Sequence, residues 1–273
     1  MPELPEVETI VRCLRPHLSG LQVRSVRLLF PPILRDPVRS PLEKLIGRRI
    51  SGLRRRGKLI LVDLSGGLTL IVHLKMTGQL IFSGQNEPPD KHTHFILSFR
   101  KSPGELRFRD VRKFGFIRAV PTAEAERTRE VSPLGPEPLE LDRAAFLERL
   151  QGRRGRLKGL LLNQRVIAGI GNIYADEILY EAGLHPRTDV SHLGRRRLER
   201  LYAAVSKVLE EAIVFKGTTV RDFRDGLGLE GLFQNRLRVY GREGEVCRRC
   251  GGRIRRIRLS GRSTHFCPGC QRR

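Results

Sequence analysis

Two Cys-x-x-Cys pairs near the end of the sequence restrict its fold more tightly than any other feature. Cys247 and Cys250 form the first pair, and Cys267 and Cys270 form the second after sixteen intervening residues. Each pair can present two sulfurs from a tight turn to one tetrahedral Zn²⁺, and the stretch between them has the length of a β-hairpin. Two disulfides are the alternative, which a reducing cytosol disfavours. Because four thiolates leave no open coordination position, the pattern predicts one structural zinc ion.

The spacing of apolar residues changes part-way along the chain. It predicts an N-terminal helix over 7–18, and a Pro- and Glu-rich linker over 121–140. Between them lie strand-length segments rich in β-branched and aromatic residues: 23–30, 49–56, 58–64, 68–74, 78–83, 93–99, 105–108 and 115–120. Helical spacing follows the linker, at 142–151, 157–162, 172–182, 193–215 and 220–224. We expect an α+β fold: an antiparallel β-sandwich with a leading helix, then a helical domain, then the hairpin, divided as 1–130, 131–238 and 239–273.

The charge of the chain points to a polyanionic partner. Lys and Arg number 52 against 29 Asp and Glu, a formal net charge of +23, which repels itself unless an anionic surface neutralises it. A ribosome-type binding protein has the same imbalance, so charge alone does not separate a binder from an enzyme. Residues 241–273 hold ten Arg and two Glu, which makes the zinc hairpin itself cationic. No apolar run of about 20 residues and no signal segment is present, so we expect a cytosolic protein.

The opening residues MPELPEVET are the most specific part of a set of motifs that runs through the chain. The others are RGK (56–58), HLKMTG (73–78), DVRKFG (110–115), GIGNIYA (169–175), GTT (217–219), VYGR (239–242) and the zinc hairpin. In this order they resemble the formamidopyrimidine-DNA glycosylases, bacterial repair enzymes of the superfamily shared with endonuclease VIII. The resemblance covers the whole chain. It implies a helix–two-turn–helix element in the helical domain and DNA with oxidised purines as the substrate.

The resemblance also implies a catalytic group at the N-terminus. Once Met1 is removed, the secondary amine of Pro2 is free, and α-amines have a pKa near ~8, so a useful neutral fraction exists at pH 7. Its attack on the sugar C1′ gives a Schiff base, from which β,δ-elimination cleaves the strand. Glu3 is the family's proton-transfer residue, and Glu6 resembles a supporting acid. Lys58 and Arg262 match further catalytic positions, near the phosphates that flank the lesion.

Other matching positions imply contacts with DNA. Positions that contact DNA are matched by His73, His92, Arg112, Asn172, Tyr240 and Arg256. Asn172 is expected to cap the helix that it opens, with the free amides facing a phosphate. Met76, Arg112 and Phe114 match residues that fill the gap left by an extruded base, although core packing is the ordinary role of a single Met or Phe. Damaged double-stranded DNA bound by a monomer is therefore the expected complex.

Two other functions remain open from the residues, and some positions depart from the family pattern. An endonuclease VIII-like enzyme would prefer oxidised pyrimidines, and a non-catalytic zinc protein would bind DNA without reacting. Lys75 and Lys113 stand where relatives often carry Gly and Arg. The segment 224–232 matches the family's lesion-covering loop poorly, and Lys158 lies where relatives carry a basic residue near the lesion.

Overall fold

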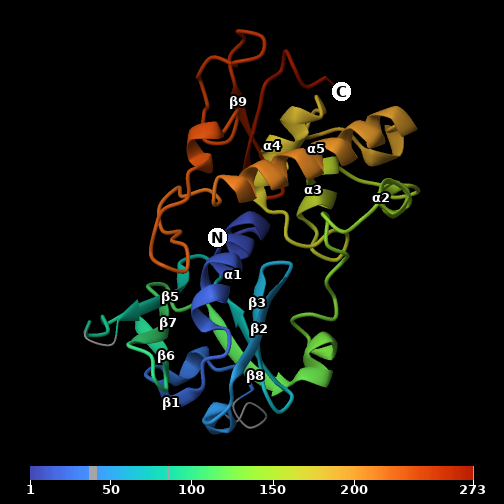
Figure 1. The fold of residues 1–273 in the computed structure, drawn as a ribbon. Coiled ribbons are helices and arrows are strands. Elements are labelled where there is room, and N and C mark those ends of the chain that lie inside the picture. The colour runs from blue at the N-terminus through green and yellow to red at the C-terminus, as the bar shows by residue number, and fades with distance from the viewer. Residues whose placement is uncertain (37–41, 85–86, 273) are drawn as a thin grey trace. The chain divides into compact units, whose positions relative to one another are not determined.

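The computed structural model describes residues 1–36, 42–84 and 87–272. Contacts divide the chain into two compact units (Figure 1). Unit 1 comprises 1–132 and 215–232, and unit 2 comprises 133–214 and 233–273. The segment 215–232 thus returns to unit 1 although it follows the longest helix of unit 2. The three-part division of the sequence into functional domains stays a prediction.

Unit 1 begins with helix α1 (Leu4–Leu18), whose apolar face is fully buried. Pro5 in its first turn needs no hydrogen-bonded amide there. One antiparallel sheet has the order β1 (Val23–Leu28), β6 (Thr93–Phe99), β7 (Gly104–Asp110), β5 (Gly78–Gly84). The other has the order β2 (Ile50–Arg56), β3 (Leu59–Leu64), β4 (Leu68–His73), β8 (Phe116–Pro121). Side chains from α1 and both sheets share one buried cluster, so the predicted β-sandwich with a leading helix is confirmed.

Unit 2 is mainly helical and ends in a hairpin. Its helices are α2 (Arg143–Leu150), α3 (Leu157–Leu162), α4 (Asn172–Glu181) and α5 (Arg195–Val214), and its strands are β9 (Arg255–Leu259) and β10 (Arg262–Phe266). Helix α4 is buried along almost its whole length, against α3, α5 and β10. The strands pair antiparallel through a two-residue turn, Ser260-Gly261, with both φ angles positive, as a tight hairpin requires. The predicted helical domain and hairpin are confirmed.

Short 3-10 helices complete the chain, and one of them lies inside the expected linker. They are η1 (Pro31–Ile33), η3 (Leu42–Leu45), η4 (Thr122–Arg127), η5 (Val190–His192) and η6 (Phe233–Arg236). The helix predicted over 220–224 is wrong, because 220–222 form a bend and 223–224 have no regular secondary structure. Its backbone is occupied elsewhere: Gln79 Nε2 donates to the Asp222 carbonyl at 2.6 Å, and the Thr219 hydroxyl donates to the Phe223 carbonyl at 3.1 Å.

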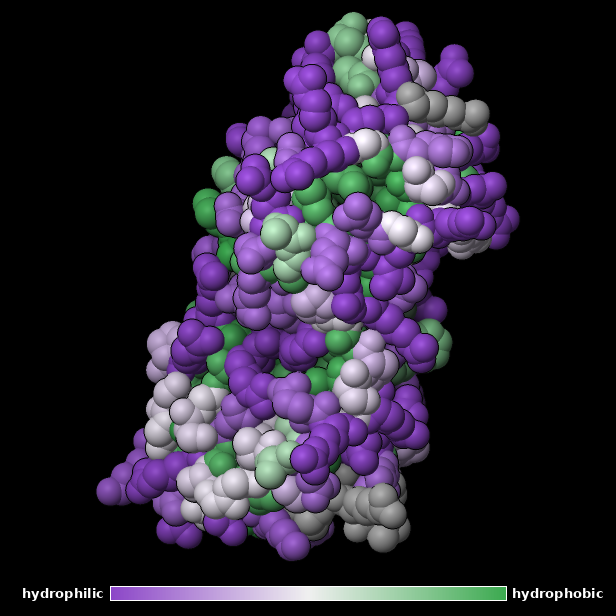
Figure 2. Space-filling view, turned by 90° about the vertical axis from the view of Figure 1, so that its right-hand side faces the viewer, coloured by the Kyte–Doolittle hydropathy of each residue, from purple (hydrophilic) through white to green (hydrophobic). Residues whose placement is uncertain are grey.

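Hydrophilic residues dominate the face of the molecule that Figure 2 draws. Apolar residues on this face lie in small separate groups. This agrees with the 30% of charged residues in the sequence. Among the described residues, no helix is both long and apolar enough to cross a membrane.

Candidate active site and metal centre

The residues that follow Met1 are buried, and one carboxylate holds their backbone in place. Pro2 and Glu3 lie directly before α1, and both are buried. Glu6 Oε2 accepts a hydrogen bond from the Glu3 amide at 2.8 Å, and its Oε1 accepts one from the Thr218 amide at 2.7 Å. Glu6 therefore fixes the backbone at the expected catalytic terminus and joins it to the 217–219 motif.

The terminal amine lies within electrostatic reach of several ionisable groups. Burial lowers the pKa of the Met1 amine from its ordinary value of 8.0; Glu3 and Glu6 raise it, and Lys58 lowers it further. Lys58 is itself buried, in the turn between β2 and β3. Three of the predicted site residues, Pro2, Glu3 and Lys58, therefore share one region of unit 1. An amine placed here is more easily neutral at pH 7 than a solvated one.

The segment 215–232 forms a closed loop on unit 1. Its ends meet where the Leu232 amide donates to the Phe215 carbonyl at 2.8 Å. Gly217 has φ +76°, and a Cβ there would lie 2.9 Å from Glu6 Oε1, so only glycine fits beside the buried carboxylate. Within the loop, Asp225 Oδ1 accepts from the amides of Leu227 and Leu229. The part of the sequence that departs from the family is therefore an ordered turn built on Asp225.

Asp110, at the end of β7, organises two neighbouring loops. Its carboxylate is fully buried and accepts from the Thr77 hydroxyl, from the Arg112 amide at 3.2 Å and from the Gly115 amide at 2.7 Å. The two carboxylate oxygens of Asp110 therefore join the turn after β4 to the turn after β7. A Cβ at Gly115 would lie 2.5 Å from the Phe108 ring, which explains the glycine of the DVRKFG motif.

The three predicted void-filling side chains are carried by these two loops. Met76 is 42% exposed and Phe114 is 52% exposed, so neither has the core-packing role that is usual for its residue type. The Arg112 guanidinium lies 4.7 Å from the centroid of the Phe114 ring, and it is also exposed. Asp110 thus presents an aromatic ring and a guanidinium together, with a flexible apolar side chain on the adjoining loop.

The two histidines of unit 1 that are predicted to contact DNA differ in their surroundings. His73, the last residue of β4, accepts a hydrogen bond at Nδ1 from the Lys75 amide at 2.9 Å. Burial, followed by the charges of Lys75 and Lys58, lowers the pKa of His73 to about 3. The ring is neutral with its proton on Nε2, which makes Nε2 a hydrogen-bond donor. His92 is half-buried, and its amide donates to Asp90 Oδ1 at 3.1 Å.

In unit 2, the residues that open α4 are linked to the hairpin. The N-cap of α4 is Gly171, and Asn172 is already its first helical residue, so the expectation that Asn172 caps the helix is wrong. Its Nδ2 instead donates to the Ser263 carbonyl on β10 at 3.1 Å. The amide side chain is long enough to reach the strand that packs on this helix, and its position therefore depends on the hairpin.

A buried ion pair holds the same two elements together. Lys158 Nζ lies 2.6 Å from Asp176 Oδ1 and donates to Thr264 Oγ1 at 2.8 Å. Asp176 Oδ2 accepts from the His265 amide at 2.8 Å. Lys158 is therefore a buried structural partner of α4 and β10, although its position in the sequence suggested a place near the lesion.

A second buried carboxylate of α4 fixes the VYGR segment. Glu177 accepts three backbone hydrogen bonds, from Arg238 and Val239 at 2.9 Å and from Tyr240 at 2.8 Å. Burial raises the pKa of Glu177, against the lowering effect of these amides. The Tyr240 ring then packs edge-on against His265. The predicted phosphate contact Tyr240 is thus held by its own backbone and by the hairpin.

The two predicted arginines of the hairpin are both exposed. Arg262 begins β10 directly after the turn. Arg256 lies on β9 opposite His265 and forms an ion pair with Glu243 at 2.8 Å. A pair exposed on both sides contributes little to stability, so Arg256 can exchange Glu243 for a phosphate at low cost.

The four paired cysteines meet at one point. All four Sγ atoms lie within 4.8 Å of one another, with 3.8 Å between those of Cys247 and Cys270 and 3.4 Å between those of Cys250 and Cys267. A tetrahedral zinc with Zn–S bonds of about 2.3 Å needs sulfurs about 3.8 Å apart. The donor set and its spacing therefore fit one zinc ion, with no position left for a reactant.

Family models match most of the chain. The Formamidopyrimidine-DNA glycosylase N-terminal domain matches residues 1–117, the Formamidopyrimidine-DNA glycosylase H2TH domain matches 134–224, and the zinc finger found in FPG and IleRS matches 244–273. The H2TH match confirms the helix–two-turn–helix expectation. The chain belongs to the formamidopyrimidine-DNA glycosylase family. It is a DNA glycosylase of DNA repair, as the sequence predicted.

Relatives and solved structures support this membership over the full length. Formamidopyrimidine-DNA glycosylase of Desulforamulus reducens is 46% identical and covers 100% of this chain, which in turn covers 99% of it. The Moorella thermoacetica protein of the same name is 47% identical over 94% of this chain and 95% of its own. A Lactococcus lactis FPG mutant in complex with Fapy-dG containing DNA has a TM-score of 0.91 at 35% identity, with both chains fully covered.

Several of the buried residues that hold the predicted site residues were not predicted from the sequence. Asp110 was noticed only as a member of the DVRKFG motif, and Asn172 was predicted to contact DNA. Only the fold shows that Asp110 joins two loops and that Asn172 donates to the Ser263 carbonyl. Asp176 and Glu177 were not singled out. Two adjacent acids in the otherwise apolar run Ile173–Tyr180 are the signal that was available, since buried acids need partners.

Proposed function

We propose that the chain is a bifunctional DNA glycosylase and AP lyase that removes oxidised purines, 8-oxoguanine and formamidopyrimidines, with Pro2 as the nucleophile. The observation that carries this proposal is the burial of Pro2 together with Glu3 and Lys58, both of which lie within electrostatic reach of the Met1 amine that precedes Pro2. Solved relatives at 35–36% identity are complexes with Fapy-dG and carbocyclic 8-oxo-G containing DNA, which supports this substrate class.

In the proposed reaction, removal of Met1 frees the Pro2 amine. The nitrogen lone pair attacks C1′ of the damaged nucleotide as the bond from C1′ to the base breaks. The departing base takes its proton from Glu3. Glu3 then takes the proton that the attacking nitrogen loses and gives it to O4′ as the C1′–O4′ bond breaks, which leaves an iminium between C1′ and Pro2. The iminium acidifies the neighbouring C2′, two eliminations release the phosphates on either side, and water then frees Pro2 from the unsaturated sugar fragment. Lys58 and Arg262 are assigned to the flanking phosphates, because each is cationic and one lies beside the terminus.

The proposed DNA contacts use the exposed or half-buried residues described above. His73 donates from Nε2 to a phosphate, and His92, Asn172, Tyr240 and Arg256 add further backbone contacts. Met76, Arg112 and Phe114 occupy the space of the extruded base, since Asp110 presents them at the surface. A monomer that works in the bacterial cytosol is part of the proposal.

Zinc is assigned to Cys247, Cys250, Cys267 and Cys270. The zinc finger family match and the sulfur spacing support it. When bound, the ion supplies structural order to the cationic hairpin and takes no part in the reaction, because four thiolates saturate it.

Borohydride trapping tests the central proposal. The full chain is incubated with an 8-oxoguanine·cytosine duplex and sodium borohydride, which reduces a Schiff base to a stable amine link. Covalent protein–DNA adduct is the expected result, with a matched thymine glycol duplex giving less. Excision without any trapped adduct would overturn the Pro2 chemistry, and stronger reaction on thymine glycol would favour the endonuclease VIII-like specificity.

A further inference from the structure

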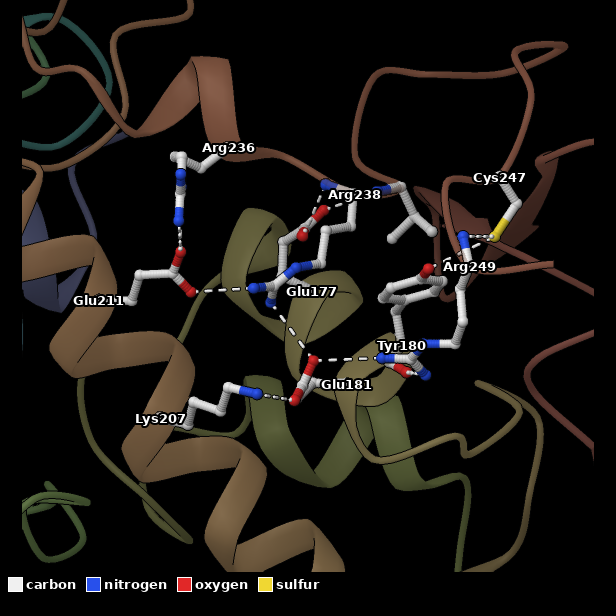
Figure 3. Close-up of polar contacts among 10 residues, drawn as sticks. Glu177, Tyr180, Glu181, Lys207, Glu211, Arg236, Arg238, Cys247 and Arg249 are labelled. Atoms are coloured by element: carbon white, nitrogen blue, oxygen red, sulfur yellow. Dashed lines mark hydrogen bonds and ion pairs between the residues drawn. The ribbon is translucent and has the colours of Figure 1, made fainter. Parts of the chain in front are cut away.

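Tyr180, on the last full turn of α4, contacts the predicted metal centre. Its hydroxyl oxygen lies 3.3 Å from Cys247 Sγ, and the residue is 2% exposed (Figure 3). A metal-bound cysteine is a thiolate and has no proton. The tyrosine hydroxyl must then be the donor of this hydrogen bond, which reaches the cluster from a helix outside the hairpin.

Arg249 holds the tyrosine ring in this orientation. Its guanidinium carbon lies 4.3 Å from the ring centroid, and its Nη1 donates to the Tyr180 carbonyl at 3.1 Å. Its Nη2 lies 3.2 Å from Glu181 Oε2. Arg249 lies within the Cys247–Cys250 turn, which carries two of the four sulfurs. The same turn therefore also holds the Tyr180 ring, whose hydroxyl donates to Cys247.

Further ion pairs connect the Arg249–Glu181 pair to α4 and α5. Glu181 pairs with Arg238 at 3.4 Å and with Lys207, which comes from α5. Figure 3 shows these groups converging on Glu181 from three segments. The Arg249 guanidinium is thus positioned from both the tyrosine and the carboxylate side, so the Tyr180 hydroxyl has little freedom to turn away from Cys247.

We propose that Tyr180 is a positioning residue of the zinc centre, which donates a hydrogen bond to the Cys247 thiolate and thereby strengthens metal retention. This inference rests on the zinc assignment under the proposed function and extends it beyond the four ligands. Hydrogen bonds to ligand atoms orient them and spread their charge, and their loss typically costs about 10- to 100-fold in metal affinity. The Arg249 amide also donates to this sulfur, at 3.4 Å, from within the Cys247–Cys250 turn, so Tyr180 adds a donor from outside the hairpin.

Tyr180→Phe tests the proposal because it removes the hydroxyl and keeps the ring under Arg249. Zinc affinity of the full chain is measured by competition with a chelating dye, and we expect a loss of about tenfold. The cobalt-substituted full chain is compared by absorption, where the thiolate-to-cobalt charge-transfer band should shift in the variant. Tyr202→Phe is the matched control, since its hydroxyl donates to the Leu141 carbonyl at 3.2 Å and has no contact with a cysteine.

Weaker zinc binding and a shifted band in Tyr180→Phe alone would support the proposal. Unchanged affinity and spectrum would overturn it, and so would an equal loss in both variants, which would indicate general destabilisation. Lower thermal stability with an unshifted cobalt band would also overturn it. A wild-type chain that binds no stoichiometric metal would instead overturn the zinc assignment, a result that the unmutated protein reveals on its own.

Discussion

The β-sandwich of unit 1 and the zinc hairpin of unit 2 both present cationic or aromatic side chains from tight turns, but they are supported differently. The sandwich has two four-stranded sheets and a large shared core. The hairpin has two strands over a cluster of Tyr180, Val239, Cys247, Ile254 and Cys267. Two strands alone are marginal in water. A loop of the sandwich therefore needs one buried carboxylate, whereas the hairpin needs a metal ion.

The comparison implies that the two regions have different roles, and each role can be tested by mutation. Unit 1 holds the proposed nucleophile on a frame that needs no ion. The hairpin of unit 2 carries the proposed cationic contacts, which the proposed zinc ion would order. Changes at the N-terminus of unit 1 should therefore remove chemistry and spare binding, and changes at the cysteines of the hairpin should weaken binding.

The largest effect is expected from blocking the amine. A chain that retains Met1 should lose trapping and excision by about a thousandfold or more, because the nucleophilic nitrogen is then an amide. Pro2→Gly should be severely impaired as well, and duplex binding should survive in both. Single-turnover excision and borohydride trapping measure this, with mass spectrometry to establish the state of Met1.

Glu3→Gln is the internal control for that experiment. It should suppress base excision and still open a pre-formed abasic site slowly, since the amine remains available. Efficient trapping by protein shown to retain Met1 would falsify the Pro2 assignment and make Lys58 the next candidate.

Cys247→Ser and Cys270→Ser test the role of the hairpin. Three thiolates hold zinc poorly, so metal should be released and duplex affinity should fall, by about tenfold or more, as the hairpin loses order. Metal content is measured by atomic absorption, and affinity by fluorescence anisotropy. Full metal retention with undiminished binding in both variants would contradict a structural zinc.

Asp110→Asn tests whether one carboxylate organises the insertion loops. An amide nitrogen cannot accept from the Gly115 or Arg112 amide, so a buried donor is left unsatisfied at a cost of about 1–3 kcal/mol. We expect excision about tenfold slower with affinity for an abasic duplex nearly kept. Asp63→Asn, in the same sandwich, is the control. Equal excision rates for Asp110→Asn and wild type would show that Asp110 does not organise the two loops for the reaction.

A smaller effect is expected at the tip of the hairpin. Arg262→Ala should weaken binding by about 1 kcal/mol, and reduce the slope of log affinity against log salt by about one, as for the loss of one phosphate contact. The fold should stay intact by circular dichroism. A salt slope equal to that of the wild type would place Arg262 outside the interface.

The smallest effect concerns pH. The pKa of His73 is lowered to about 3 in the folded chain, so the unfolded chain binds the extra proton first as pH falls below 6.5. Folded stability is therefore lost between about pH 6.5 and 3. His73→Gln should make the thermal midpoint less dependent on pH in this window, and an unchanged dependence would contradict an imidazole that stays neutral in the folded chain.

Much of the fold could be predicted from local patterns. Strands such as 93–99 were located to the residue because β-branched and aromatic runs between turn residues are short-range signals. The helix expected over 220–224 failed because Asp222 and Phe223 use their backbone carbonyls in contacts with Gln79 and Thr219. Tertiary hydrogen bonds overrode a weak local preference there.

The sequence by itself determined the four-cysteine centre, the sandwich, the helical unit and the family, because spacing and periodicity are properties of neighbouring residues. Only the tertiary structure decided which groups support the site. Glu6 meets Thr218 from 212 positions away, and Lys158 meets Thr264 from 106. A buried carboxylate or ammonium needs a partner, but the local sequence does not predict which distant segment supplies that partner. Only in the folded chain does Asp110 join its two loops, and only there does the Tyr180 hydroxyl contact Cys247.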